Sequence, residues 1–214
     1  MELIKYEINT GAKNMQIDSD LLDDAIRNQK HEPVFRLYGW SPKCISLGRN
    51  QKDDFIDKNS GIDCVRRLTG GRALLHDDEV TYSCIIPIDS VPDGQSVTES
   101  YKYISQILID FFKTLGVSLE FGQNKKISTH YDYCMLLTTG ADVCFEGKKI
   151  IGSAQFRKEG YILQHGSILF DYDKPTLEKL FHENVKDIIT VKEILPDMQK
   201  ETFVRLFENY IAGV

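Results

Sequence analysis

The stretch Arg66-Arg67-Leu68-Thr69-Gly70-Gly71-Arg72-Ala73-Leu74-Leu75-His76 carries more information about this chain than any other. An apolar, strand-like approach over residues 62–65 runs into two arginines and then into two glycines. Adjacent glycines allow a positive φ and leave no Cβ in the way of a ligand. The stretch therefore predicts a wall for a slender apolar chain, with basic side chains at its mouth. A basic surface turn has the same composition, so the stretch alone leaves both interpretations open.

Three further blocks accompany this stretch. One, upstream, is Trp40-Ser41-Pro42-Lys43-Cys44-Ile45-Ser46-Leu47-Gly48. Another is Glu146-Gly147-Lys148-Lys149-Ile150-Ile151-Gly152-Ser153-Ala154-Gln155, which again places a lysine before a glycine. The last is Gln164-His165-Gly166-Ser167-Ile168-Leu169. The four blocks extend over residues 40–169 and so involve most of the chain, which makes coincidence a poor explanation.

Composition indicates one globular domain over residues 1–214, because 42% of the residues are hydrophobic and the length suffices for one core. No apolar run is long enough to cross a bilayer, and the first residues lack a signal-peptide pattern. Five cysteines without a CxxC pair argue against disulfides and zinc. The net charge of −6 argues against nucleic acid as a partner. We therefore expect a cytoplasmic protein with no metal site and no membrane contact.

Hydrophobic periodicity predicts an α+β fold. Helices are expected over residues 14–28 and 96–115, and three helical stretches close the chain. The apolar face expected for the longest helix consists of Tyr103, Ile104, Ile107, Leu108, Phe111 and Phe112. Strands are expected at residues 3–8 (an edge strand), 34–38, 44–47, 80–87, 117–121, 143–145, 149–156 and 161–170. Residues 124–139 are polar and without period, which predicts a long functional loop.

Together, the four blocks resemble the superfamily that contains lipoate and biotin protein ligases and octanoyltransferases. The resemblance implies a lipoate/biotin ligase-like catalytic domain, with a mixed, largely antiparallel central sheet flanked by helices. Residues 65–83 are similar in detail to the LipM class of octanoyltransferases, including Arg72 in place of a third glycine. Members of that class are acyltransferases that use a cysteine nucleophile.

The five cysteines divide into two groups. Four lie in strand-like runs and are expected to be small buried hydrophobic residues: Cys44, Cys64, Cys84 and Cys144. Cys134 lies in an irregular loop, where its neighbours alone favour a thiol packed under tyrosines. Lys149 alone is typical of a solvated hairpin residue. The resemblance implies otherwise, because the LipM-class nucleophile precedes the catalytic lysine by the same 15 positions that separate Cys134 from Lys149.

The resemblance implies transfer of an octanoyl group from octanoyl-acyl carrier protein to a lysine of a lipoyl domain, with no cofactor. The acceptor would be a glycine-cleavage H protein or a dehydrogenase E2 domain. An acyl-Cys134 thioester would form, and the Lys149 ammonium would favour the reactive thiolate. Backbone N–H groups near Gly152 or Gly70 and Gly71 would stabilise the oxyanion. The substrate-binding residues implied are Arg67, Thr69, Gly70, Gly71, Arg72, His76, Gly152, Ser153, Ala154, His165, Gly166 and Ser167. Structural roles for the two histidines stay open.

The main alternative is an ATP-dependent lipoate–protein ligase, which would form lipoyl-AMP, require ATP and magnesium, and need no cysteine. A biotin ligase is less favoured, because its Gly-Arg-Gly-Arg-type loop is absent from the sequence. A Walker-type phosphate loop is absent as well. A third possibility is a module that binds lipoyl domains without catalysis. Acylation of Cys134 in the absence of nucleotide would separate these alternatives.

Overall fold

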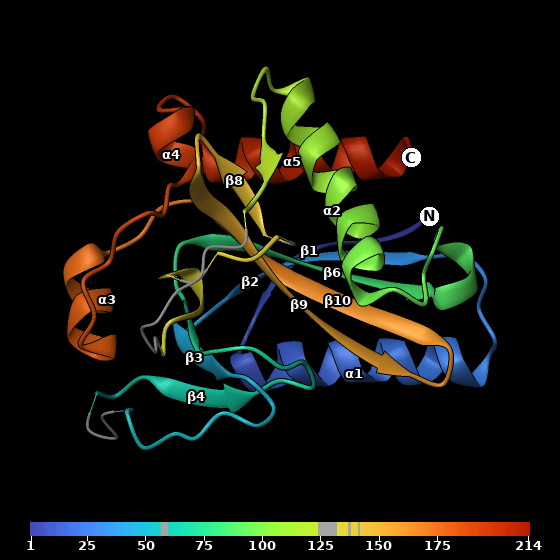
Figure 1. Cartoon of the computed structure of the whole chain (residues 1–214), viewed down its shortest axis with the longest axis horizontal. Helices are drawn as coiled ribbons and strands as arrows, with labels where there is room; N and C mark the ends of the chain where they lie inside the picture. Colours follow the sequence, from blue (N-terminus) through green and yellow to red (C-terminus); the bar gives the residue numbers. More distant parts are fainter. Residues whose placement is uncertain (57–59, 124–131, 137, 141) are drawn as a thin grey trace.

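The computed structural model describes residues 1–56, 60–123, 132–136, 138–140 and 142–214. A seven-stranded sheet has the order β1-β2-β6-β10-β9-β8-β7, and a three-stranded sheet has the order β4-β3-β5 (Figure 1). The strands are β1 (Glu2–Asn9), β2 (Val34–Trp40), β3 (Cys44–Leu47), β4 (Asp63–Arg66), β5 (Leu74–His76), β6 (Glu79–Pro87), β7 (Glu120–Phe121), β8 (Val143–Phe145), β9 (Lys148–Lys158) and β10 (Tyr161–Leu169). In the large sheet β1 runs parallel to β2, and the other named pairings are antiparallel. The predicted α+β fold with a mixed, largely antiparallel sheet is confirmed.

Helices cover both faces of the large sheet (Figure 1). They are α1 (Gly11–Arg27), α2 (Val97–Thr114), α3 (Lys174–Phe181), α4 (Val191–Ile194) and α5 (Lys200–Ala212), with short 3-10 helices η1 (Ile88–Ser90) and η2 (Cys134–Leu136). Phe35 of β2 packs in one cluster with residues of α2 and α5, whereas Val34 packs with residues of α1. Successive strand residues point to opposite faces, so β2 is buried on both sides.

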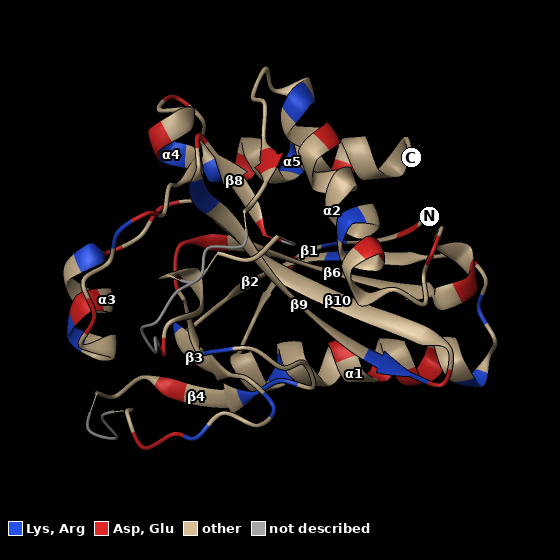
Figure 2. Ribbon diagram, viewed as in Figure 1, with Lys and Arg blue, Asp and Glu red and all other residues tan. Residues whose placement is uncertain are grey.

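The predicted long helices are present and begin at side-chain caps. Thr10 caps α1 by accepting from the Lys13 amide, so this helix begins three residues earlier than the pattern indicated. Ser96 caps α2 by accepting from the Glu99 amide. The apolar face predicted for α2 was wrong at Tyr103, which is 43% exposed. Both acidic and basic residues lie on the helices that flank the sheet (Figure 2). No helix in the described parts of the chain is long and apolar enough to span a membrane.

The predicted meander of β8, β9 and β10 is confirmed, with its two tight turns. Glu146 and Gly147 join β8 to β9 with φ of 49° and 75°. Glu159 and Gly160 join β9 to β10 with φ of 46° and 82°. Two successive residues with positive φ match the right-handed twist of a hairpin, which explains the glycine at the second position.

Several local predictions need correction. The strand expected over residues 117–121 is limited to β7, and β5 was not predicted because it has only three residues. Cys64 is exposed rather than buried, because it lies on β4 at the edge of the small sheet. Burial was predicted correctly for Cys44, Cys84 and Cys144. Much of the loop predicted over residues 124–139 lies outside the described residues, and η2 falls in its described part.

Candidate active site

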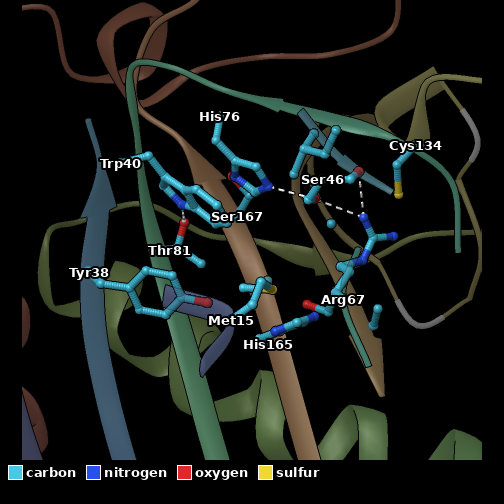
Figure 3. A pocket seen from close by; sticks show the side chains of 15 residues that line it. Met15, Tyr38, Trp40, Ser46, Arg67, His76, Thr81, Cys134, His165 and Ser167 are labelled. Atoms are coloured by element: carbon cyan, nitrogen blue, oxygen red, sulfur yellow. Dashed lines mark hydrogen bonds between the residues drawn. The ribbon is translucent and has the colours of Figure 1, made fainter. Parts of the chain in front are cut away.

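Two cavities adjoin where the large sheet meets the small one. The inner cavity is the smaller one and is lined by Met15, Tyr38, Trp40, Ser46, Arg67, Leu74, His76, Thr81, Cys134, Gly152, Ser153, Ala154, His165, Gly166 and Ser167 (Figure 3). The outer cavity is lined by Gly71, Arg72, Val97, Thr98, Tyr101, Cys134, Thr139, Gly140, Asp142, Lys149 and Ser153. Cys134 and Ser153 line both cavities. These two residues therefore mark the passage between them.

Backbone hydrogen bonds fix Cys134 beside the Gly-Gly stretch. The Cys134 amide donates to the carbonyl oxygen of Ala73 (2.8 Å), and the Ala73 amide donates to that of Asp132 (3.0 Å). The thiol-bearing residue is half-buried. The predicted nucleophile thus lies next to the segment that follows Gly71, although the two are far apart in the sequence.

Lys149 is the predicted partner of Cys134, and the structure brings the two residues together. Its side chain is buried, and Nζ donates to the carbonyl oxygen of Cys134 (3.1 Å) and to Oδ1 of Asp142 (3.0 Å). Burial would lower the pKa of Lys149, but the charges of Cys134 and Asp142 raise it above its ordinary value. Lys149 is therefore a buried ammonium group, not the solvated hairpin residue that local sequence favours.

Asp142 completes this cluster and was not predicted. Its Oδ2 accepts from the amide (2.6 Å) and the hydroxyl (2.9 Å) of Thr139, while Oδ1 accepts from Lys149. One carboxylate thus joins Lys149 to Thr139, which also lines the outer cavity.

Gly152 provides space for the lysine. A Cβ at this position would lie 2.8 Å from Sδ of Met135 and 3.1 Å from Cε of Lys149. Real Cβ atoms are essentially never found at the first distance and seldom at the second. The glycine therefore allows close packing of protein side chains, in addition to lining the inner cavity.

Arg67 holds the Gly-Gly turn. The residue is 7% exposed, and its guanidinium donates to the carbonyl oxygens of Gly70 (3.0 Å) and Arg72 (2.8 Å) and to both oxygens of Ser46 (2.8 and 2.9 Å). Gly71 has a φ of 94°, as the glycine pair predicted. Gly71 and Arg72 line the outer cavity, while Gly70 lines neither. Gly70 and Gly71 were expected to form a wall for a slender apolar chain, but the glycines that line the inner cavity are Gly152 and Gly166.

His165 is held on both ring nitrogens. Nε2 bonds to Oγ1 of Thr69 (2.7 Å), and Nδ1 bonds to Oδ2 of Asp18 (3.2 Å). Asp18 is buried and also accepts from Arg36 (2.8 Å) and Tyr38 (2.9 Å). Burial lowers the pKa of His165 below its ordinary value, in spite of the neighbouring carboxylate. Thr69 lines neither cavity and acts by holding this imidazole.

His76 forms a second imidazole–carboxylate pair. Nδ1 bonds to the buried Glu79, Nε2 bonds to Oγ of Ser46 (2.7 Å), and the ring stacks on Trp40 at a centroid distance of 3.7 Å. Glu79 also accepts from the hydroxyl of Ser167. Burial would raise the pKa of Glu79, but His76 and the hydroxyl donors lower it.

The polar side chains around the inner cavity therefore satisfy one another. Among the described residues, the only buried side-chain nitrogen or oxygen without a partner is Nε of Arg157, which is not part of this lining. Buried polar groups that are already paired offer little to a polar ligand. The inner cavity is suited to an apolar ligand.

Sequence reasoning missed the carboxylates that organise this site: Asp18, Glu79 and Asp142. One signal was available. Arg36 interrupts an otherwise apolar strand, and a buried arginine needs a buried partner. Its partner is Asp18, which lies on a helix whose acidic residues are typical of a solvated face.

Comparison with known proteins gives consistent matches. Residues 10–212 match the family described as the lipoyl protein ligase A/B catalytic domain. Octanoyltransferase LipM of Staphylococcus epidermidis is 41% identical over 215 residues, which cover 92% of this chain and 75% of that protein. The LipM octanoyltransferase of Staphylococcus aureus is 42% identical, over 87% of this chain and 73% of its own.

Solved structures share the fold. A lipoate-protein ligase A bound with ATP superposes with a TM-score of 0.76 over 99% of this chain and 84% of its own, at 19% identity. A putative lipoate protein ligase from T. acidophilum with bound lipoic acid gives a TM-score of 0.75 over the same shares, at 20% identity.

Proposed function

Because the chain belongs to the lipoyl protein ligase A/B catalytic domain family, we propose that it is an octanoyltransferase of the LipM type that acts in protein lipoylation. The donor is octanoyl-acyl carrier protein, and the acceptor is a lysine of a lipoyl domain, either a glycine-cleavage H protein or a dehydrogenase E2 domain. The reaction takes place in the cytoplasm and needs no cofactor.

One observation carries the proposal: Cys134 lies where the two cavities meet, and the Lys149 ammonium donates a hydrogen bond to the backbone carbonyl oxygen of Cys134. The inner cavity, whose polar groups are already paired, is suited to the octanoyl chain. The larger outer cavity is suited to the arm of the carrier and then to the acceptor lysine. A thioester carbonyl on Cys134 would lie between them.

In the first half-reaction the Cys134 thiolate attacks the carbonyl carbon of the octanoyl thioester. The nearby ammonium favours this thiolate by charge attraction. A carbon–sulfur bond to Cys134 forms, the bond to the carrier sulfur breaks, and the carrier leaves as a thiolate. Lys149 can supply the proton that converts it to a thiol, which leaves a neutral amine beside the acyl-enzyme.

In the second half-reaction the acceptor amine attacks the acyl-Cys134 carbonyl. Neutral Lys149 can take the proton that this amine loses as the amide forms. The Cys134 thiolate leaves, so the thiolate–ammonium pair is restored. The buried location of Lys149 supports this role, because exclusion of water strengthens the charge interaction.

The ATP-dependent ligase alternative is not favoured. The relatives at about 40% identity are named octanoyltransferases, whereas the structures named ligases match at 19–20% identity and show the fold alone.

Intact-mass measurement after mixing with octanoyl-acyl carrier protein, without nucleotide, tests the proposal. We expect one octanoyl adduct on the wild type and none on Cys134→Ser, with peptide mapping to residues 132–136. An adduct on Cys44, Cys64, Cys84 or Cys144 would refute the nucleophile. Lipoylation that needs ATP and survives Cys134→Ser would make the chain a ligase.

A further inference from the structure

Ser153 shares the junction of the two cavities with Cys134. It lies on β9 opposite Gly166 of β10. Its hydroxyl is 2.7 Å from the phenol oxygen of Tyr82, which is its only hydrogen-bond partner among the residues that the structure describes. The direction of that hydrogen bond decides what the Ser153 proton can do.

The direction follows from the group behind Tyr82. Nε2 of Gln164 donates to the phenol oxygen of Tyr82 (2.8 Å). Burial raises the pKa of Tyr82 well above its usual value, so the phenol keeps its proton. Since this oxygen already accepts from Gln164, its own proton is directed to Oγ of Ser153. The Ser153 proton is then free for an acceptor in the cavities.

Gln164 is itself oriented by neighbouring side chains. Its Oε1 accepts from Nε2 of Gln155 (2.8 Å), and Oε1 of Gln155 lies 3.3 Å from Oγ of Ser100. Ser100 accepts from Arg157 (2.6 Å), whose guanidinium can only donate. The chain of donors therefore runs from Gln155 through Gln164 and Tyr82 toward Ser153.

Gly166 makes room for the last hydrogen bond of this chain. A Cβ at position 166 would lie 2.6 Å from Oγ of Ser153 and 2.7 Å from Cε1 of Tyr82. Any other residue at this position would force the two side chains to move. The Ser153–Tyr82 pair and the glycine opposite it thus form one arrangement.

We propose that the Ser153 hydroxyl donates a hydrogen bond to the carbonyl oxygen of the acyl group under attack at Cys134, with Tyr82 and Gln164 as positioning residues; this rests on the proposed octanoyltransferase function. When the Cys134 thiolate adds to the carbonyl carbon, the π electron pair moves to the oxygen, and Ser153 stabilises that negative charge. When the carrier sulfur leaves, the pair returns and the double bond reforms. Ser153 keeps its proton throughout. Accepting from Tyr82 makes its hydroxyl a stronger donor.

The test compares two reactions of the same thiol. Acylation by octanoyl-acyl carrier protein passes through an oxyanion, whereas alkylation by iodoacetamide does not. In Ser153→Ala we expect the rate of acyl-enzyme formation at saturating donor to fall about 100-fold, as when one oxyanion donor is lost elsewhere. The alkylation rate of Cys134 and its pH profile should stay unchanged, and Ser153→Thr should restore much of the acylation rate.

Tyr82→Phe tests the relay. It keeps the Ser153 hydroxyl but removes the donor that orients it, so we expect a smaller loss of about 3- to 10-fold in acylation. Tyr161→Phe is the matched control, because Tyr161 lies on the same strand as Gln164, donates to the carbonyl oxygen of Lys30 and lines neither cavity. Its acylation rate should equal that of the wild type.

The outcomes separate this inference from the function on which it rests. A wild-type protein that forms no acyl-enzyme would refute the proposed function. If the wild type is acylated and Ser153→Ala is acylated equally fast, the assignment of Ser153 alone is overturned. A parallel loss of acylation and alkylation in Ser153→Ala would also overturn it, because Ser153 would then act on the thiol or on the fold.

Discussion

Replacing Asp142 by Asn should destabilise the protein through the lysine that it leaves behind. The side chains of Asp142 and Lys149 are 6% and 2% exposed, and their ionic groups are 3.0 Å apart. Asparagine preserves the shape and can still bond to Thr139. It removes the negative charge, so the Lys149 ammonium loses its carboxylate partner.

The magnitude follows from burial. Removal of one member of a buried ion pair typically costs about 3–5 kcal/mol, because the other charge stays buried without compensation. Lys149 retains the carbonyl oxygen of Cys134 and borders the outer cavity, which places the loss lower, at about 2–3 kcal/mol. For a chain of this length each kcal/mol lowers Tm by about 2–4 °C. We expect Tm to fall by about 4–12 °C.

Calorimetry of three variants measures this effect. Adding Lys149→Met to Asp142→Asn should raise Tm above that of the single variant, since the buried ammonium that lost the Asp142 charge is then removed. Asp23→Asn is the control, because its ion pair with Lys158 (2.8 Å) is exposed and should move Tm by less than about 2 °C. If Asp142→Asn melts with the wild type, or if the double variant melts below Asp142→Asn, the argument from burial is wrong.

Three further predictions concern the same site. Lys149→Ala should slow iodoacetamide alkylation of Cys134 at pH 7 by at least about 10-fold, with partial recovery at higher pH. Lys149→Arg should keep much of the alkylation rate but transfer the acyl group poorly. Superimposable plots of alkylation rate against pH for the wild type and Lys149→Ala would show that Cys134 and Lys149 are not coupled. Gly152→Val should reduce acyl-enzyme formation by about 100-fold in single-turnover assays, because its Cβ would lie 3.1 Å from Cε of Lys149; wild-type turnover would contradict this. Because the pKa of His165 is lowered in the folded protein, the unfolded chain binds a proton at this residue at a higher pH than the folded protein does. The free energy of unfolding should therefore keep its full value above pH 6.5, the ordinary pKa, and fall below that pH by up to about 1.4 kcal/mol per pH unit. Denaturant unfolding at several pH values should show a shallower decline for His165→Asn and an unchanged one for the exposed His31→Asn.

The sequence predicted the parts of this protein that local physics determines. Helical periodicity located α1 and α2, and the glycine at each hairpin turn located the meander. The spacing of Cys134 and Lys149, together with the resemblance, predicted a pair that the fold places in contact. The helices and turns depend on residues that are close together in the sequence, and the Cys134–Lys149 pair was inferred from a fixed spacing in the sequence.

The carboxylates of the site depend on contacts between distant segments and could not be predicted in this way. Asp18 bonds to His165, 147 positions away, and both are buried. On a helix an aspartate of this kind is typical of a solvated face, and only the packing of α1 against the sheet reverses that expectation. Exposure of Cys64 was missed for a related reason, because an apolar run does not reveal that its strand lies at the edge of a sheet.

Strand β10 contributes to the site from both of its faces, and its register determines which residues lie on each face. His165 and Ser167 bond to the carboxylates of Asp18 and Glu79, and the described lining of the inner cavity holds no buried side-chain nitrogen or oxygen without a partner. The alternate residue Gln164 directs the donor chain that ends at the cavity junction. Successive strand residues point to opposite faces, so a shift of the strand register by one residue would move His165 and Ser167 to the face of Gln164, and Gln164 to theirs. The pairing of β10 with β6 and β9 on both sides therefore fixes the polar lining of the inner cavity and the orientation of Gln164 together.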